Sequence, residues 1–265
     1  MPHAVQYDIG SRADGREYRI FVAKPAAAPP PAGYPVVYAL DANAVFGTLT
    51  EAMRVQGRRP ERTGVVPAVI VGIGYRTEAP FDSARYYDYT LPAHASELPA
   101  KPDGGVWPEQ GGADAFLRFL TEELKPAVES AMPIDTSRQT LFGHSLGGLF
   151  TLHALFAMPG SFRTYVAGSP SIHWNKRLLE EEERAFVSRL ACRAADARLL
   201  IGVGELERGH KSGMYDNAKA LSDRLAALSG LGLHTRFHEF EGEGHASVLP
   251  ALVSRALRFA SEGGG

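Results

Sequence analysis

The chain has 265 residues, 45% of them hydrophobic and 22% charged, and its formal net charge at pH 7 is -2. This is ordinary globular composition, and a chain of this length buries most of its unfolded surface without disulfides or metals. The near-neutral charge gives no reason to expect a nucleic-acid or membrane partner, and no run approaches the roughly 18 apolar residues of a membrane span.

The single cysteine, Cys192, cannot form an internal disulfide. No cluster of cysteine and histidine surrounds it, so we expect no metal site there. The first ten residues lack the basic region and apolar core of a secretory signal. Since proteins without disulfides are typical of reducing compartments, we expect a cytoplasmic protein.

Apolar runs alternate with helical patterns along the chain. EYRIFVA (17–23) alternates polar and apolar residues, as a half-exposed strand does. Most of the other predicted strands are continuous apolar runs, which are typical of strands covered on both faces. These predicted strands are residues 35–40, 68–74, 139–142, 163–168, 198–204 and 234–240.

Helical periodicity separates the later strands. Over 113–132 apolar residues recur every three or four positions, and Pro126 is expected to kink this helix or end it early. Residues 146–158 are apolar nearly all round, as a buried helix is, while 217–228 and 248–259 are amphipathic. This alternation predicts one α/β domain over residues 1–265, with a mostly parallel sheet covered by helices on both faces.

Two stretches fall outside the alternation. Residues 75–112 are rich in proline, glycine and tyrosine, and residues 170–196 contain SPSIHWNKRLLEEEER. Long excursions from a compact α/β domain are often lids or binding loops, and as often they are only decoration. We expect any lid-like insertion to come from one of these two segments.

Residues 143–147 read Gly-His-Ser-Leu-Gly, which is the G-x-S-x-G pattern of a nucleophile elbow. A predicted strand precedes the motif and an apolar helix follows it, as the motif requires. The glycines let strand and helix pass closely at a sharp turn, which lifts the serine hydroxyl clear of the sheet at the positive end of a helix. Ser145 is therefore the predicted nucleophile; the alternative is a glycine-rich turn with an idle serine.

A serine hydroxyl needs a base to become a nucleophile. In α/β-hydrolases the chain order is serine, acid, histidine, and the histidine follows the last strand. His245 lies in a glycine loop between the last predicted strand and the last predicted helix, so it is the predicted base. His210 and His173 are weaker alternatives in loops.

The acid is expected just after the strand 198–204. Glu207, three residues after Gly204, is the preferred candidate, because this spacing is common in hydrolases and a carboxylate there can hold the histidine in the right tautomer. Glu205 is the alternative, and a serine–histidine pair without a working acid is another.

A tetrahedral intermediate needs two backbone donors for its oxyanion. One is the amide of Leu146, directly after the nucleophile. The second is expected in the loop 40–46, where position indicates Ala42 or Asn43 and we prefer Asn43. The chain has no P-loop, no G-x-G-x-x-G and no H-E-x-x-H, so we expect no cofactor.

Together these segments make the chain resemble a known family, the ferric-siderophore esterases that open enterobactin, salmochelin and bacillibactin trilactones. The resemblance runs over roughly 5–258 and rests on eight segments: YPVVYALDANAVF, VGIGY, RYYDYTLPA, GGADAFLRFLTEELKP, GHSLGGLF, SPSIHWN, VGELE and GHASVLPAL. It implies an α/β-hydrolase fold with Ser145 as nucleophile and His245 as base. The family usually has D-G-N where this chain has Asp-Ala-Asn at 41–43, and often two tryptophans where it has His173 and Trp174.

The resemblance also implies an anionic substrate. A ferric tricatecholate is trianionic, so its site needs fixed cations near the serine, and arginine suits this role. Arg76, at the end of the strand 68–74, is the preferred cation. Trp174 is expected to offer a flat face to catechol rings. Further candidates are the cations Arg85, Lys176 and Arg177 and the tyrosines Tyr86, Tyr87 and Tyr89.

The sequence thus predicts a cytoplasmic serine esterase acting on a small-molecule ester, preferably a ferric siderophore. Two alternatives remain open. One is a general carboxylesterase, thioesterase or S-acyl-glutathione hydrolase without a siderophore role. The other is a binding protein that retains the elbow but has lost catalysis.

Overall fold

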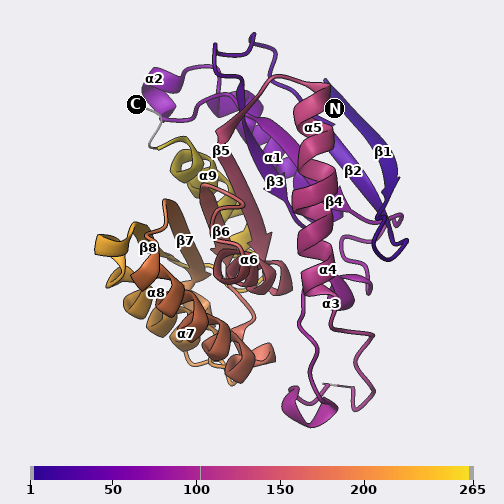
Figure 1. Cartoon of the computed structure of the whole chain (residues 1–265), viewed down its shortest axis with the longest axis vertical. Coiled ribbons are helices and arrows are strands. Elements are labelled where there is room, and N and C mark those ends of the chain that lie inside the picture. Colours follow the sequence, from indigo (N-terminus) through magenta and orange to yellow (C-terminus); the bar gives the residue numbers. More distant parts are fainter. Residues whose placement is uncertain (1–2, 102, 263–265) are drawn as a thin grey trace.

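The computed structural model describes residues 3–101 and 103–262. Within these residues, eight strands join in one sheet in the order β1-β2-β4-β3-β5-β6-β7-β8 (Figure 1). β1 runs antiparallel to β2, and β2 antiparallel to β4, while the remaining neighbours are parallel. The strands are β1 (Ala4–Gly10), β2 (Glu17–Ala23), β3 (Tyr34–Ala39), β4 (Val69–Gly74), β5 (Ile134–His144), β6 (Thr164–Gly168), β7 (Ala197–Gly204) and β8 (Leu233–Phe240).

Helices cover both faces of the sheet, as the continuous apolar strands predicted. In Figure 1, α1 (Ala42–Gln56) and α9 (Val248–Ser261) lie behind the sheet, and the other long helices lie in front. Each face has its own apolar core. The helices in front are α4 (Ala113–Arg118), α5 (Lys125–Ala131), α6 (Leu146–Ala157), α7 (Lys176–Cys192) and α8 (Met214–Ala226), and two shorter helices are α2 (Pro60–Thr63) and α3 (Arg85–Asp88).

Three elements differ from the expectation. Segment 170–196 was expected to lie outside the alternation, but most of it is α7, the helix that connects β6 to β7. The loop expected at 40–46 is already helical from Ala42 onwards. β1 was not predicted; most of its side chains are exposed, so it lacks an apolar pattern.

The helix around Pro126 does not end early. Residues Phe119–Leu124 widen into a π-helix, in which the N–H of Lys125 donates to the carbonyl of Leu120, five residues back. Pro126 then lies in the first turn of α5, where its missing N–H is tolerated. The helix therefore continues past the proline to Ala131.

The parallel strands bring several loops to one edge of the sheet, which we call the carboxyl edge. Leu40, Ser145, Ser169 and Glu205 follow directly or closely after β3, β5, β6 and β7 at this edge. Ligands of open α/β sheets bind outside the carboxyl ends of the strands. The opposite edge, where the parallel strands begin, we call the amino edge. Among the described residues, no helix is both long and apolar enough to cross a membrane.

Candidate active site

Ser145 occupies the sharp turn between β5 and α6. Its backbone has φ 59 and ψ -119, a conformation in which a residue with a side chain is strained. The neighbouring glycines make the turn possible. A Cβ on Gly143 would lie 2.1 Å from the carbonyl oxygen of Gly147, and one on Gly148 would lie 2.7 Å from that of Gly168. The steric reason for the glycines of the elbow is thus confirmed.

The structure brings Ser145, His245 and Glu207 into one hydrogen-bonded chain, although they come from three distant segments. His245 Nε2 lies 3.1 Å from Ser145 Oγ, and His245 Nδ1 lies 3.1 Å from Glu207 Oε2. The second carboxylate oxygen of Glu207 accepts hydrogen bonds from the Ser169 hydroxyl and from the Gly204 amide. Both oxygens of this buried carboxylate are therefore engaged, which fixes its direction toward the histidine.

The protonation states suit this arrangement. Burial alone raises the pKa of Glu207, but the hydrogen bonds from His245, Ser169 and Gly204 outweigh it and hold the pKa below its usual range. Glu207 is then a carboxylate at neutral pH, and it accepts a hydrogen bond from His245 Nδ1–H. Nε2 is left free to accept the proton of the Ser145 hydroxyl.

The alternatives for acid and base lie elsewhere. Glu205 accepts a hydrogen bond from the Gly242 amide at 2.9 Å. His210 is exposed, and its Nδ1 lies 2.7 Å from the Ser212 hydroxyl. Neither side chain is bonded to Ser145 or His245 within the described part of the chain. The geometry therefore selects Glu207 over Glu205 as the partner of the histidine.

Two helices, α6 and α1, begin at the carboxyl edge. Leu146 is the first residue of α6, and Asn43 lies in the first turn of α1. Over residues 3–101 and 103–262, neither backbone amide has a hydrogen-bond acceptor. The first amides of a helix have no partner within it, and they carry the positive end of its dipole. The Leu146 amide, directly after the nucleophile, can therefore stabilise an anion beside Ser145, and the role of the Asn43 amide as second donor stays a prediction.

Two further serines at the site were missed from the sequence. Ser171 Oγ lies 3.2 Å from Ser145 Oγ, and its amide donates to the carbonyl of Ser145. Ser169 is fully buried, holds Glu207, and has φ 36. The sequence does contain a signal for these two serines. Ser-Pro-Ser at 169–171 directly follows β6, which pairs with β5, the strand that leads into the elbow.

Comparison with known proteins identifies the family. The family model described as "Putative esterase" matches residues 11–247. The chain belongs to this esterase family. It is 59% identical over 252 residues to the ferri-bacillibactin esterase BesA of Bacillus subtilis, which covers 95% of this chain and 87% of that protein. It is 38% identical over 250 residues to a siderophore enterobactin esterase of Emericella nidulans, covering 85% of this chain and 81% of that one.

A solved structure resembles this esterase closely. The crystal structure of BES protein from Bacillus cereus matches with a TM-score of 0.91 at 44% identity, over 98% of this chain and 96% of that one. The predicted α/β-hydrolase fold is thus confirmed, with the sheet, the crossover helices and the elbow where the fold has them.

The predicted substrate cations of the esterase are engaged by carboxylates. Arg76 Nη1 donates to Glu17 at 2.8 Å, and its Nε lies 3.5 Å from Asp8, so the side chain is directed toward β1 and β2. Contact of Arg76 with a substrate stays a prediction, and it requires the side chain to leave these partners. Arg177 likewise pairs with Glu97 and Glu181.

Trp174 is buried in an aromatic cluster. Only 4% of the residue is exposed, and its ring centroid lies 4.6 Å from that of Trp107 and 5.4 Å from that of Tyr86. Trp107 and Tyr86 both come from segment 75–112. The role of Trp174 as a flat face for catechol rings stays a prediction, and this packing means that the rings of segment 75–112 share in any such face.

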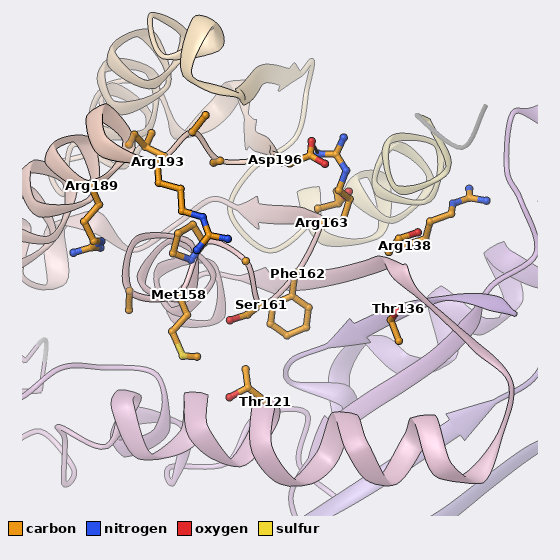
Figure 2. Close-up of a pocket in the computed structure, with 18 of the residues that line it drawn as sticks. Thr121, Thr136, Arg138, Met158, Ser161, Phe162, Arg163, Arg189, Arg193 and Asp196 are labelled. Carbon is orange, nitrogen blue, oxygen red and sulfur yellow. Dashed lines mark ion pairs between the residues drawn. The ribbon is translucent and has the colours of Figure 1, made fainter. Parts of the chain in front are cut away.

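One large hollow of the esterase lies away from the serine. It has a volume of about 1670 Å³ and lies at the amino edge, where β5, β6 and β7 begin (Figure 2). Figure 2 shows Arg138, Arg163 and Arg193 among the residues around it. Neither Ser145 nor His245 lines this hollow. Its size therefore does not mark it as the catalytic site.

Proposed function

We propose that this esterase is a serine hydrolase that opens the ester bonds of a ferric catecholate trilactone and so releases iron. The observation that carries the proposal is the hydrogen-bonded chain from Ser145 Oγ through His245 to the buried Glu207 carboxylate. The similarity to a ferri-bacillibactin esterase supports the choice of substrate. The iron complex is substrate here, so the protein's own groups do the chemistry.

In the proposed mechanism, His245 Nε2 takes the proton of Ser145 as Oγ attacks the ester carbonyl. The amides of Leu146 and Asn43 donate to the oxyanion of the tetrahedral intermediate. His245 then gives its proton to the leaving alcohol oxygen, and Glu207 stabilises the imidazolium while it exists. Water activated by the same histidine attacks the acyl-enzyme, releases the acid and restores the Ser145 hydroxyl.

The test compares hydrolysis of a ferric tricatecholate trilactone with hydrolysis of p-nitrophenyl butyrate, in wild type and Ser145→Ala. We expect the iron complex to be preferred, and kcat/KM to fall by roughly 10³–10⁶-fold in the variant. Activity on the aryl ester alone would remove the siderophore role and leave a general carboxylesterase. Undiminished activity of Ser145→Ala would overturn the mechanism.

A fluorophosphonate probe separates catalysis from mere binding. It should label wild type at Ser145 and leave Ser145→Ala unlabelled, as read by intact-protein mass. A wild-type protein that binds the iron complex but takes no label would be a binding protein instead of an enzyme.

We also propose a cytoplasmic location, supported by the exposed free thiol of Cys192, since such thiols persist in reducing compartments. Cell fractionation tests it: recovery with a periplasmic or secreted marker would contradict the assignment.

A further inference from the structure

Arg85 has no free charge to offer a substrate, because Asp41 already engages it. Its Nε and Nη2 donate to the two carboxylate oxygens of Asp41 at 2.9 and 2.8 Å. The side chains of both residues are nearly buried, at 9% and 6% exposed. Arg85 lies in α3, within segment 75–112, whereas Asp41 directly precedes α1. The pair therefore ties the inserted segment to the beginning of α1.

Asp41 occupies an unusual place in the backbone. It has φ 52 and ψ 45, the left-handed conformation that residues with a side chain seldom adopt. The two next residues carry the first free amides of α1, those of Ala42 and Asn43. The conformation of Asp41 therefore determines where these amides point.

The carboxylate of Asp41 also lies against the elbow. A Cβ built on Gly147 would be 3.3 Å from Asp41 Oδ2, so the carboxylate packs beside the residue that follows Leu146. The ion pair thus lies at the beginning of α1 and against the first turn of α6, the helix that follows Ser145. A shift of Asp41 changes the separation of the two donors.

Segment 75–112 holds the same turn at two more points. The side chain of Asn43 accepts from the Tyr75 amide at 2.8 Å and donates to the carbonyls of Tyr75 and Thr77. The amide of Asp41 donates to the hydroxyl of Tyr89 at 3.2 Å. All three anchors come from outside α1, so the turn is fixed by its surroundings as well as by its own sequence.

Stability alone is a weak reason for such a pair. Two charges lose their hydration on burial, and well-packed apolar side chains of similar volume often replace a buried pair without loss of stability. What the planar guanidinium adds is direction, since its two parallel hydrogen bonds allow the carboxylate only one orientation.

We propose that Arg85 is a positioning residue for ester hydrolysis: through Asp41 it orients the turn at 41–43 so that the Asn43 amide faces the oxyanion formed at Ser145. This inference rests on the proposed function. Because the oxyanion exists only in the intermediate and the flanking transition states, the pair affects kcat and leaves KM nearly unchanged.

The experiment compares Arg85→Met and Arg85→Lys with Arg224→Met. Arg224 is a matched control because it also makes a two-pronged pair, with Glu183 at 2.7 Å for both bonds, but between α7 and α8. Active sites are titrated to completion with a fluorophosphonate, so that kcat is expressed per competent serine and loss of folded protein is removed from the result.

For Arg85→Met we expect kcat per titrated site on p-nitrophenyl butyrate to fall by about 10- to 100-fold, with KM changed by less than about threefold. Affinity for a trifluoromethyl ketone, which forms an oxyanion on the serine, should fall by the same factor as kcat/KM. Arg85→Lys keeps the positive charge but cannot make two parallel hydrogen bonds. Its kcat per titrated site should therefore lie between those of wild type and Arg85→Met. Arg224→Met should keep the wild-type kcat per site.

Unchanged kcat per titrated site in both Arg85 variants, with only a lower Tm, would overturn the inference and leave a structural pair. If Arg85→Met yields no titratable protein, Arg85→Lys alone decides in the same way. Failure of the proposed function is distinguishable, because it shows as activity retained in Ser145→Ala, whatever the Arg85 variants do.

Discussion

The two edges of the sheet are chemically opposite, although both are rich in polar side chains. Helices that connect parallel strands begin at the carboxyl edge and end at the amino edge, so their free amides gather at the first and their free carbonyls at the second. At the amino edge, Arg189 donates to the carbonyl of Phe156 in the last turn of α6. Arg138 and Arg198 donate to the carbonyls of Ser261 and Phe259 at the end of α9.

At the carboxyl edge the balance is reversed. The amides of Leu146 and Asn43 have no acceptor within the described residues, and His245 lies within hydrogen-bond distance of both Ser145 and Glu207. The hollow described above belongs to the amino edge, where carbonyls at helix ends accept hydrogen bonds from Arg138, Arg189 and Arg198. The comparison teaches that the groups left without a partner, and not the size of a cavity, mark where this molecule can do chemistry.

Among substitutions that test this difference between the two edges, the largest loss of activity is expected at Glu207. In Glu207→Gln the amide cannot stabilise the imidazolium, so kcat should fall by about 10²–10⁴-fold. Glu205→Gln is the matched control, because among the described residues the Glu205 carboxylate accepts a hydrogen bond only from the Gly242 amide. It should keep nearly full activity in the same steady-state assay. Equal effects of the two substitutions would show that the histidine works without its carboxylate.

A smaller effect is expected in the pH dependence of stability. Burial lowers the pKa of His144, beside the nucleophile, from 6.5 to about 3. Below pH 6.5 the unfolded chain therefore binds a proton that the folded chain does not, so the free energy of unfolding falls as pH falls. The contribution of His144 at pH 5 is about 2 kcal/mol relative to pH 8. Urea unfolding of wild type and His144→Gln at both pH values measures it.

Asp88 provides the control for that measurement, because its contribution has the opposite sign. Burial raises its pKa from 3.8 to about 6, so the folded chain keeps a proton that the unfolded chain has lost, and this stabilisation disappears as pH rises through 6. Asp88→Asn should therefore change the difference in the free energy of unfolding between pH 5 and pH 8 in the direction opposite to that of His144→Gln. A shift in the same direction for both variants would contradict these assignments.

The smallest effect is expected at the amino edge. Arg189→Met removes the donor to the Phe156 carbonyl and should lower the free energy of unfolding by about 1 kcal/mol. Its kcat/KM should stay within about twofold of wild type, because the helix it caps still begins beside Ser145. A large loss of activity in a variant of normal stability would break the comparison, since the hollow at this edge would then take part in catalysis.

The features that are local in sequence were predictable. Strands β3, β4, β6 and β7 are short, largely apolar runs, whereas only the last part of β5 is one. The elbow is marked by glycines within five residues, so it also follows from neighbouring side chains. β1 was hidden because an exposed edge strand has no apolar pattern. The beginning of α1 was expected to be a loop at 40–46, although Val45, Phe46, Leu49 and Met53 recur at helical spacing.

Ser145, Glu207 and His245 could be predicted although they meet only in the fold, because their order along the chain is that of α/β-hydrolases. Contacts for which no such order exists were not predictable. Arg85 was a candidate for binding an anion because a sequence gives its charge and not the position of Asp41, 44 residues away. Trp174 was expected to be a free aromatic face because nothing in the sequence shows that Trp107 packs against it. Ser169 and Ser171 escaped for the same reason: their contacts with Glu207 and Ser145 cross from one strand end to the next.

Segment 75–112 has a consequence for anyone who wishes to redesign this enzyme. Its first part, residues 75–89, supplies Tyr75, Arg85 and Tyr89 to the turn before α1. Its later part supplies Trp107 to the aromatic cluster around Trp174. We expect a graft of the whole segment from a relative to change substrate preference and turnover together. A graft of residues 90–112 alone retains Tyr75, Arg85 and Tyr89, and we expect it to leave the turn as it is. Residue 90 is therefore the junction at which we expect substrate specificity to be changed without a change in the turn before α1.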